Sequence, residues 1–192
     1  MPLLPFSHAH QGETMAGSFF KNVASLLIAL FALGYVLPDR AHVERDVVID
    51  APPEKIFALI SDLKSWKEWA PLSSIAPQAD DHLNGAGQAF EIQSAHLLPA
   101  RFTQEIVAAA EPARLVTRTR LAGLGETDSA FTLLPDEDGA VRVVWSLDSN
   151  LRDHAPFLLK PFWTYASYFA EPALGPASER SLAKLKRVAE AG

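Results

Sequence analysis

The chain of 192 residues contains no cysteine, which excludes disulfide cross-links, thiolate metal sites and cysteine nucleophiles. It also lacks an excess of positive charge: 17 Lys and Arg residues are outnumbered by 23 Asp and Glu residues, and the formal net charge is −6. Proteins that bind nucleic acid need basic residues to neutralise phosphates, so no nucleic-acid partner is predicted. Hydrophobic residues make up 48% of the chain, which is enough for a packed core.

The longest uncharged stretch is VASLLIALFALGYVL, residues 23–37. Extended back to Phe19, it approaches the roughly 20 residues that a helix needs to cross a bilayer, provided that the amine of Lys21 reaches the headgroups. We therefore predict a single-pass membrane anchor. The predicted organisation is a flexible tail at 1–18, the anchor helix at 19–38 and one domain at 39–192.

Two other interpretations of this segment remain open. Ala32-Leu33-Gly34 loosely fits the pattern of a signal-peptide cleavage site, and the segment could also be a helix buried in the core. The side of the membrane that holds the domain is undetermined, because Lys21 precedes the segment while Arg40 and Arg45 follow it. Met15 is a second possible start of the chain.

The sequence HVERDVVID, residues 42–50, alternates between apolar and polar side chains, which predicts a half-buried strand. Ala51-Pro52-Pro53 then predicts a sharp turn into a helix, because proline is favoured in the first helical turn. Apolar residues at helical spacing follow between positions 56 and 63. Trp66 and Trp69 share one face of a second short helix that ends before the next proline.

Five further alternating stretches, separated by turns, predict a curved antiparallel sheet. They lie at residues 87–95, 101–110, 114–123, 127–134 and 141–147. From Pro156 the chain is predicted to be helical, with breaks at Pro172 and Pro176. The last helical section carries Leu182 and Leu185 on one apolar stripe.

Two segments carry a family resemblance. VERDVVIDAPPEKIFALISDLKSWKEWAP at 43–71 and LGPASERSLAKLKRVAE at 174–190 resemble the START-related helix-grip superfamily called SRPBCC, on its polyketide cyclase/dehydrase branch. The resemblance covers residues 41–191. It implies an α+β helix-grip fold, in which a curved antiparallel sheet wraps around a long C-terminal helix and two short helices plug one end.

The inward faces of the predicted strands offer a candidate pocket. They carry apolar, hydroxyl and amide side chains, none of which titrates near neutral pH, whereas acid–base catalysis needs a positioned titratable group. No catalytic residue and no cofactor is therefore predicted, and the wall suits a hydrophobic ligand. The predicted ligand-binding residues on strands are Phe90, Ile92, Phe102, Gln104, Thr117, Thr119, Phe131, Trp145 and Leu147. Tyr165 and Phe169 join them from an aromatic segment that the resemblance places over the cavity mouth.

Charged residues suggest no competing site. Arg45 is the only charged residue in phase with an inward strand face, either near a strand end or in a buried ion pair. The six histidines lack metal-ligand spacing, and Asp80-Asp81-His82 is interpreted as a solvated loop, so no metal site is predicted. Arginines on the outward faces fit a solvated surface or a contact with anionic lipid heads. Trp163 and Tyr168 suggest contact with a membrane interface.

Three functions remain in competition. The leading one is membrane-tethered binding of a hydrophobic small molecule, such as a lipid or an isoprenoid-like compound. The alternative is a cyclase/dehydrase-type enzyme with an apolar substrate, which the resemblance suggests although the inward face offers no acid or base. The third is a structural or interaction module with a filled core.

The uncharged run at 23–37 predicts how the protein partitions. Full-length protein should require detergent for extraction, whereas a chain that begins at Asp39 should be soluble and folded. Ultracentrifugation of both forms tests this. Uncleaved full-length protein in the supernatant would contradict the anchor.

Overall fold

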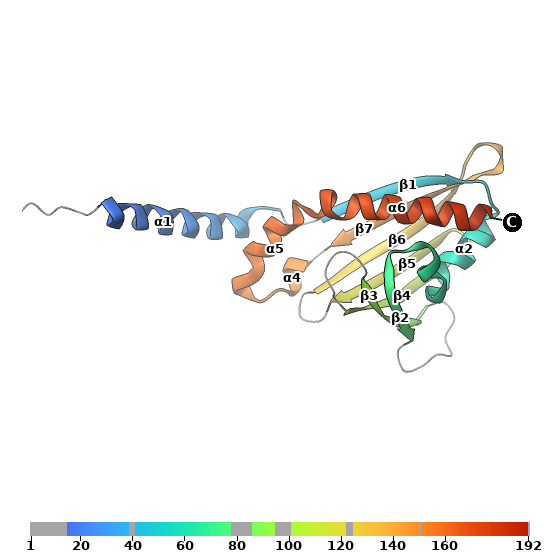
Figure 1. The fold of residues 1–192 in the computed structure, drawn as a ribbon, viewed down its shortest axis with the longest axis horizontal. Helices are drawn as coiled ribbons and strands as arrows, with labels where there is room; N and C mark the ends of the chain where they lie inside the picture. The colour runs from blue at the N-terminus through green and yellow to red at the C-terminus, as the bar shows by residue number, and fades with distance from the viewer. Residues whose placement is uncertain are drawn as a thin grey trace, which may run out of the picture.

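The computed structural model describes residues 15–38, 41–77, 86–94, 101–121, 125–149 and 151–191. The predicted α+β helix-grip fold is confirmed: one curled antiparallel sheet of seven strands is crossed by a long C-terminal helix (Figure 1). The strands are β1 Ala41–Ile49, β2 Leu72–Pro77, β3 Ala89–Ser94, β4 Arg101–Ala110, β5 Arg114–Leu121, β6 Gly125–Pro135 and β7 Val141–Ser149. The α-helices are α1 Met15–Val36, α2 Pro53–Ser61, α3 Trp66–Trp69, α4 Leu151–His154, α5 Lys160–Ser167 and α6 Ala170–Glu190. Short 3-10 helices are η1 Leu63–Ser65, η2 Glu137–Gly139 and η3 Phe157–Leu159.

The strand order in the sheet is β1-β7-β6-β5-β4-β3-β2, so β1 and β2 form the edges. Six of these strands coincide with the predicted alternating stretches, but β2 was not predicted. It pairs with β3 through a register that shifts between Leu72 and Ser74, and its apolar residues do not alternate regularly. An edge strand of this kind is specified by its pairing rather than by its own pattern.

The predicted helix after β1 is confirmed as α2. Pro53 stands in its first turn, where the missing N–H costs no hydrogen bond, and the carbonyl of Pro52 accepts from the amides of Lys55 and Ile56. Ile56, Phe57 and Ile60 are buried against the core. The spacing of these residues therefore places α2 across one end of the sheet.

The two tryptophans close the end of α2. The last carbonyls of a helix have no partner within it, and here the indole N–H of Trp66 donates to the Ile60 carbonyl at 2.9 Å. The indole of Trp69 donates to the Leu59 carbonyl at 3.3 Å. Trp69 is fully buried, and its ring meets Phe131 edge-on at a centroid distance of 6.0 Å. The tryptophan pair thus plugs this end of the curved sheet.

The long helix α6 is continuous, so the predicted breaks at Pro172 and Pro176 are wrong. The chain changes direction earlier, at Phe169, which lies between α5 and α6. Pro172 falls in the first turn of α6, where proline is tolerated, and Pro176 lies inside the helix. The helix continues past Pro176 because its C-terminal half buries Leu182 and Leu185 in the core.

The buried side of α6 changes character along its length. Its N-terminal half buries Gly175 and Ser178, whereas its C-terminal half buries Ser181, Leu182, Leu185 and Ala189. Burial of apolar area is the main favourable term in packing, at about 25 cal/mol per Å². The C-terminal half of α6 is therefore held to the sheet more firmly than the N-terminal half.

The helix α1 projects away from the sheet, with its C-terminal end beside α4 and α5 (Figure 1). Its stretch Gly17–Val36 is long and apolar enough to cross a bilayer, a property shared by membrane anchors and signal sequences. The side chains along it are almost all exposed, so α1 is not a core helix. Residues 1–14 of the predicted tail, and positions 39 and 40 of the predicted boundary, lie outside the described residues.

The burial of Trp69 predicts a large stability effect. Trp69→Ala should lower the free energy of unfolding by about 3–5 kcal/mol, because it removes a buried ring and leaves a cavity. Urea unfolding would measure this. The control Leu134→Ala, at a side chain 43% exposed, should change the free energy by only about 0.5 kcal/mol. Equal effects of the two variants would contradict the plug.

Candidate functional site

A row of polar side chains crosses the concave side of the sheet at the end where β1 begins. Gln104, Thr119, Thr127 and Ser149 are direct partners on β4, β5, β6 and β7. Thr119 donates its hydroxyl to the Gln104 side-chain oxygen at 2.6 Å, and the hydroxyls of Thr127 and Ser149 are 3.5 Å apart. Gln104 is buried, whereas the other three side chains are partly exposed. The concave side is thus more open and more polar at this end.

The next row inward contains a buried hydroxyl without a partner. Thr117 pairs with Ser129, and Ser129 pairs with Leu147. The Ser129 hydroxyl accepts from the Trp145 indole at 2.6 Å. Thr117 Oγ1 is completely buried and has no hydrogen-bond partner in the structure. Leaving such a group unpaired costs about 1–3 kcal/mol, so this position is suited to a polar atom of a ligand or a water molecule.

The predicted pocket residues on strands are brought together on the concave side. Phe90, Ile92, Gln104, Thr117 and Phe131 are buried there. The remaining members of the group are partly exposed, namely Phe102, Thr119, Trp145 and Leu147.

The two predicted residues outside the strands lie elsewhere. The Tyr165 hydroxyl donates to the carbonyl of Leu30 in α1, and the side chain of Phe169 is 68% exposed. Neither residue therefore belongs to the group on the strands. The ligand-binding role of all eleven residues stays a prediction.

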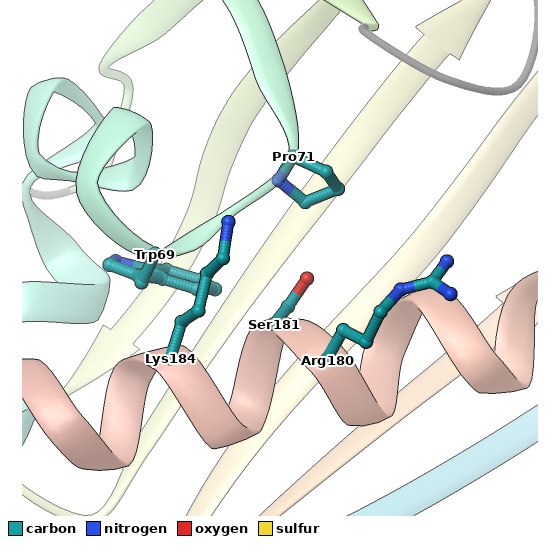
Figure 2. A pocket seen from close by; sticks show the side chains of 5 residues that line it. All are labelled: Trp69, Pro71, Arg180, Ser181 and Lys184. Carbon is teal, nitrogen blue, oxygen red and sulfur yellow. The ribbon is translucent and has the colours of Figure 1, made fainter.

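Aromatic rings fill the concave side at the plugged end. Phe131 and Trp145 stack with centroids 4.9 Å apart, and Trp69 meets Trp145 edge-on at 6.2 Å. Between this cluster and α6 remains a pocket of about 110 Å³ (Figure 2). It is lined by Trp69, Pro71, Arg180, Ser181 and Lys184. In Figure 2, Lys184 and Ser181 reach from α6 towards Trp69 and Pro71, whereas the guanidinium of Arg180 is directed away from Trp69.

A second hollow, of about 310 Å³, lies at the plugged end of the sheet and is lined by residues around Pro53, Pro112, Leu133 and Pro135. Its lining is largely apolar, and the carboxylate of Asp136 that also lines it is paired with Arg142 at 2.8 Å. It lies away from the polar rows described above.

Arg45 forms an ion-pair network with α6, but the pair is not buried as one predicted alternative had it: the side chains of Glu171 and Glu179 are 51% and 60% exposed. The Arg45 guanidinium donates to Glu171 and, at 2.7 Å, to Glu179. These hydrogen bonds raise the pKa of Arg45, Glu171 contributing most. A Cβ atom at Gly175 would overlap the guanidinium in its present position, so the missing side chain leaves room for Arg45 between the two carboxylates. The sequence indicated the charge of Arg45 but not its partners, which are more than a hundred residues away.

The outward arginines are neutralised by carboxylates on neighbouring strands. Arg118 is 2.7 Å from Asp128, and Arg120 contacts both Glu105 and Glu126. These pairs leave no uncompensated basic stripe on this part of the outer face. In the part of the chain that the structure describes, no cluster of three His, Asp or Glu side chains could hold a metal ion.

His42 lies on the outward side of β1, with its side chain 55% exposed. It shares a hydrogen bond with Asp148, and this bond is the main cause that raises the pKa of the imidazole above its usual value. The imidazole is therefore a surface group, separated by the sheet from the concave side.

Comparison with known proteins agrees with the fold. A family model described as polyketide cyclase/dehydrase and lipid transport matches residues 40–190. Curated protein sequences give no match.

Solved structures share the architecture at low identity. A START superfamily protein from Mycobacterium smegmatis is 15% identical, with a TM-score of 0.59 over 78% of this chain and 97% of the other. An aromatase/cyclase from a Streptomyces species is 15% identical, with a TM-score of 0.58 over 79% of this chain and 94% of the other. Norcoclaurine synthase from Thalictrum flavum is 12% identical, with a TM-score of 0.59 over 83% of this chain and 92% of the other. These likenesses show the fold alone.

The contact between Arg45 and Gly175 predicts different effects in two backgrounds. Gly175→Ala should stabilise the natural chain less than it stabilises an Arg45→Ala chain, because in the natural chain the methyl group must displace the guanidinium. In an Arg45→Ala background the same change should raise the free energy of unfolding by up to about 1 kcal/mol, since alanine favours helix more than glycine does. Urea unfolding of the four chains measures the coupling. Equal effects of Gly175→Ala in both backgrounds would contradict the arrangement.

Proposed function

Because this chain belongs to the polyketide cyclase/dehydrase and lipid transport family, we propose that it binds a hydrophobic small molecule while anchored to a membrane. The ligand, a lipid or an isoprenoid-like compound, would lie between the concave side of the sheet and the N-terminal half of α6. The observation that carries the proposal is the buried, unpaired hydroxyl of Thr117 within an otherwise largely apolar wall. A single polar atom on an apolar ligand would satisfy it.

The chemistry of the wall supports binding more than catalysis. Among the described strand residues of the concave side, the charged group is Arg45, whose guanidinium is already held by two carboxylates; the pocket beside α6 adds Lys184 and Arg180. His42 and Asp148 lie on the opposite side of the sheet and bind each other. General acid–base catalysis would need a titratable group within hydrogen-bond reach of the substrate.

The related folds support a pocket for small aromatic molecules. One structure of norcoclaurine synthase holds dopamine and hydroxybenzaldehyde, and another relative is an aromatase/cyclase. Because these relatives are named as enzymes, a cyclase/dehydrase-type reaction is the alternative function for this chain.

The size of the pocket sets a requirement on binding. The space of about 110 Å³ beside α6 is smaller than the roughly 300–1,000 Å³ of typical small-molecule sites. A ligand of lipid size therefore requires the concave side to widen. The N-terminal half of α6 is the part suited to move once its ion pairs with Arg45 open, because Gly175 and Ser178 bury little apolar area compared with Leu182 and Leu185.

The contacts of α1 support its role as a retained anchor. Its last turns pack against α5, where Gly34 is buried against Pro161, and Arg152 donates to the carbonyls of Tyr35 and Leu37. Removal of α1 by a signal peptidase would abolish the packing of Gly34 on Pro161.

The proposal predicts opposite effects on stability and binding for Thr117→Val. The free protein should gain stability, because a buried unpaired hydroxyl is replaced by a methyl group of similar size. Affinity for N-phenylnaphthylamine, an apolar fluorophore with one N–H group, should fall about tenfold, equivalent to about 1.4 kcal/mol. Thr117→Ser, which keeps the hydroxyl, should bind like the natural chain.

Fluorescence titration and thermal unfolding decide the outcome. Increased stability with unchanged fluorophore binding would indicate a filled core and overturn the proposal. A matched control is Thr119→Val, whose hydroxyl is already bonded to Gln104, so its loss should destabilise the free protein.

Between about pH 6 and 8, where a free histidine titrates, affinity should be constant. A bell-shaped pH dependence abolished by His42→Gln would support the enzyme instead.

A further inference from the structure

Residues 157–169, here called the apolar segment, expose an unusual number of large hydrophobic side chains. The exposed fraction ranges from 46% at Leu159 to 71% at Leu158. The exposed residues are Phe157, Leu158, Leu159, Phe162, Tyr168 and Phe169. Soluble proteins rarely leave so much apolar surface together unless it contacts a partner.

The apolar segment is fixed to the last turns of α1. The Tyr165 hydroxyl donates to the Leu30 carbonyl. A Cβ atom on Gly34 would lie 2.8 Å from Cα of Pro161, so glycine is required for this close approach of α1 and α5. The two elements therefore cannot move apart without breaking a packed contact.

Further contacts close the junction. The Tyr35 and Phe157 rings lie 5.0 Å apart, and the Tyr35 hydroxyl donates to the Phe157 carbonyl. Arg152 donates to the Tyr35 and Leu37 carbonyls at 2.9 Å each. A positive group at this position suits the C-terminal end of a helix and satisfies carbonyls that lack partners within it. The end of α1 and the apolar segment therefore behave as one unit.

If α1 spans a bilayer, this unit determines how deep the apolar segment lies. The 20 residues of Gly17–Val36 extend about 30 Å, which matches the hydrocarbon core. Leu30 is six residues before the end of this stretch, or about 9 Å along the axis. The group that binds its carbonyl, Tyr165, must lie at a comparable depth. Interfacial helices insert their apolar side to about 5–10 Å, which is the same range.

We infer that the apolar segment is a second membrane contact, inserted at the boundary between headgroups and acyl chains beside the end of α1. This inference rests on the proposed membrane anchor. A lipid bilayer is the fitting occupant, because the segment adjoins a helix whose side chains are themselves exposed and apolar. The same bilayer would then cover the apolar surface of α1 and that of the apolar segment.

The contact also orients the domain. β1 begins at Ala41, a few residues after α1, and pairs there with Ser149 at the end of the polar row. The more open end of the concave side consequently faces the bilayer. An apolar ligand could pass between the membrane and the concave side over a short path with little exposure to water.

Single thiol labels test the inference, because the natural chain has no cysteine and each introduced thiol is unique. Leu158→Cys, Phe162→Cys and Phe169→Cys, each in the full chain, are labelled with an environment-sensitive nitrobenzoxadiazole dye. The proteins are reconstituted in phosphatidylcholine vesicles with and without nitroxide-labelled lipid. Leu26→Cys, near the middle of the apolar stretch, reports on the anchor. Leu134→Cys, exposed at the plugged end, is the matched control.

The expected result is blue-shifted emission and several-fold stronger lipid quenching at positions 158, 162 and 169 than at 134. Quenching at position 26 with solvent-like signals at all three segment positions would overturn the inference and leave the anchor standing. Absence of quenching at position 26 would overturn the anchor and the inference together. Blue-shifted but unquenched segment labels, whose shift disappears as protein is diluted in lipid, would assign the surface to a second copy and overturn the bilayer contact.

Discussion

The burial of Trp69 is the contact on which the rest of the domain depends. A curved sheet cannot cover its own concave side, and here the indole of Trp69 closes one end of it by meeting both Phe131 and Trp145. The same ring donates to the end of α2, so one side chain joins the helix pair to the sheet. Rings fill the concave side at this end, whereas the side chains at the other end are smaller and more polar.

The long helix α6 follows the same division. Leu182 and Leu185 pack at the filled end, whereas Gly175 and Ser178 lie towards the other end. Arg45 spans the site of Gly175 and holds Glu171 and Glu179, one carboxylate on each side of Pro176. This network fixes a part of α6 that apolar burial holds only weakly. A ligand that enters beneath this half of α6 would have to act against the ion pairs rather than against the core.

Much of the fold was predictable because side-chain alternation and helical spacing are local properties. The period of two identified six strands and placed Phe131, Trp145 and Thr117 on the same side, and the register confirms that they share it. The prolines after β1 marked the start of α2. Two features were not predicted. One is β2, an edge strand that is defined by its pairing with β3. The other is the continuity of α6 through Pro176, which depends on burial elsewhere in the helix.

The sequence by itself determined which residues point to the concave side, since neighbouring side chains on a strand must point in opposite directions. It also determined that this side carries few charges and that the N-terminal stretch is apolar. Only the tertiary structure decided which of the inward polar groups have a hydrogen-bond partner and which have none. The hydroxyls of Thr117 and Thr119 are alike in sequence, yet one is bonded to Gln104 and the other to nothing. That difference arises between segments far apart in the chain, which local sequence patterns cannot predict. The same holds for the partners of Arg45 and for the contact of Tyr165 with Leu30.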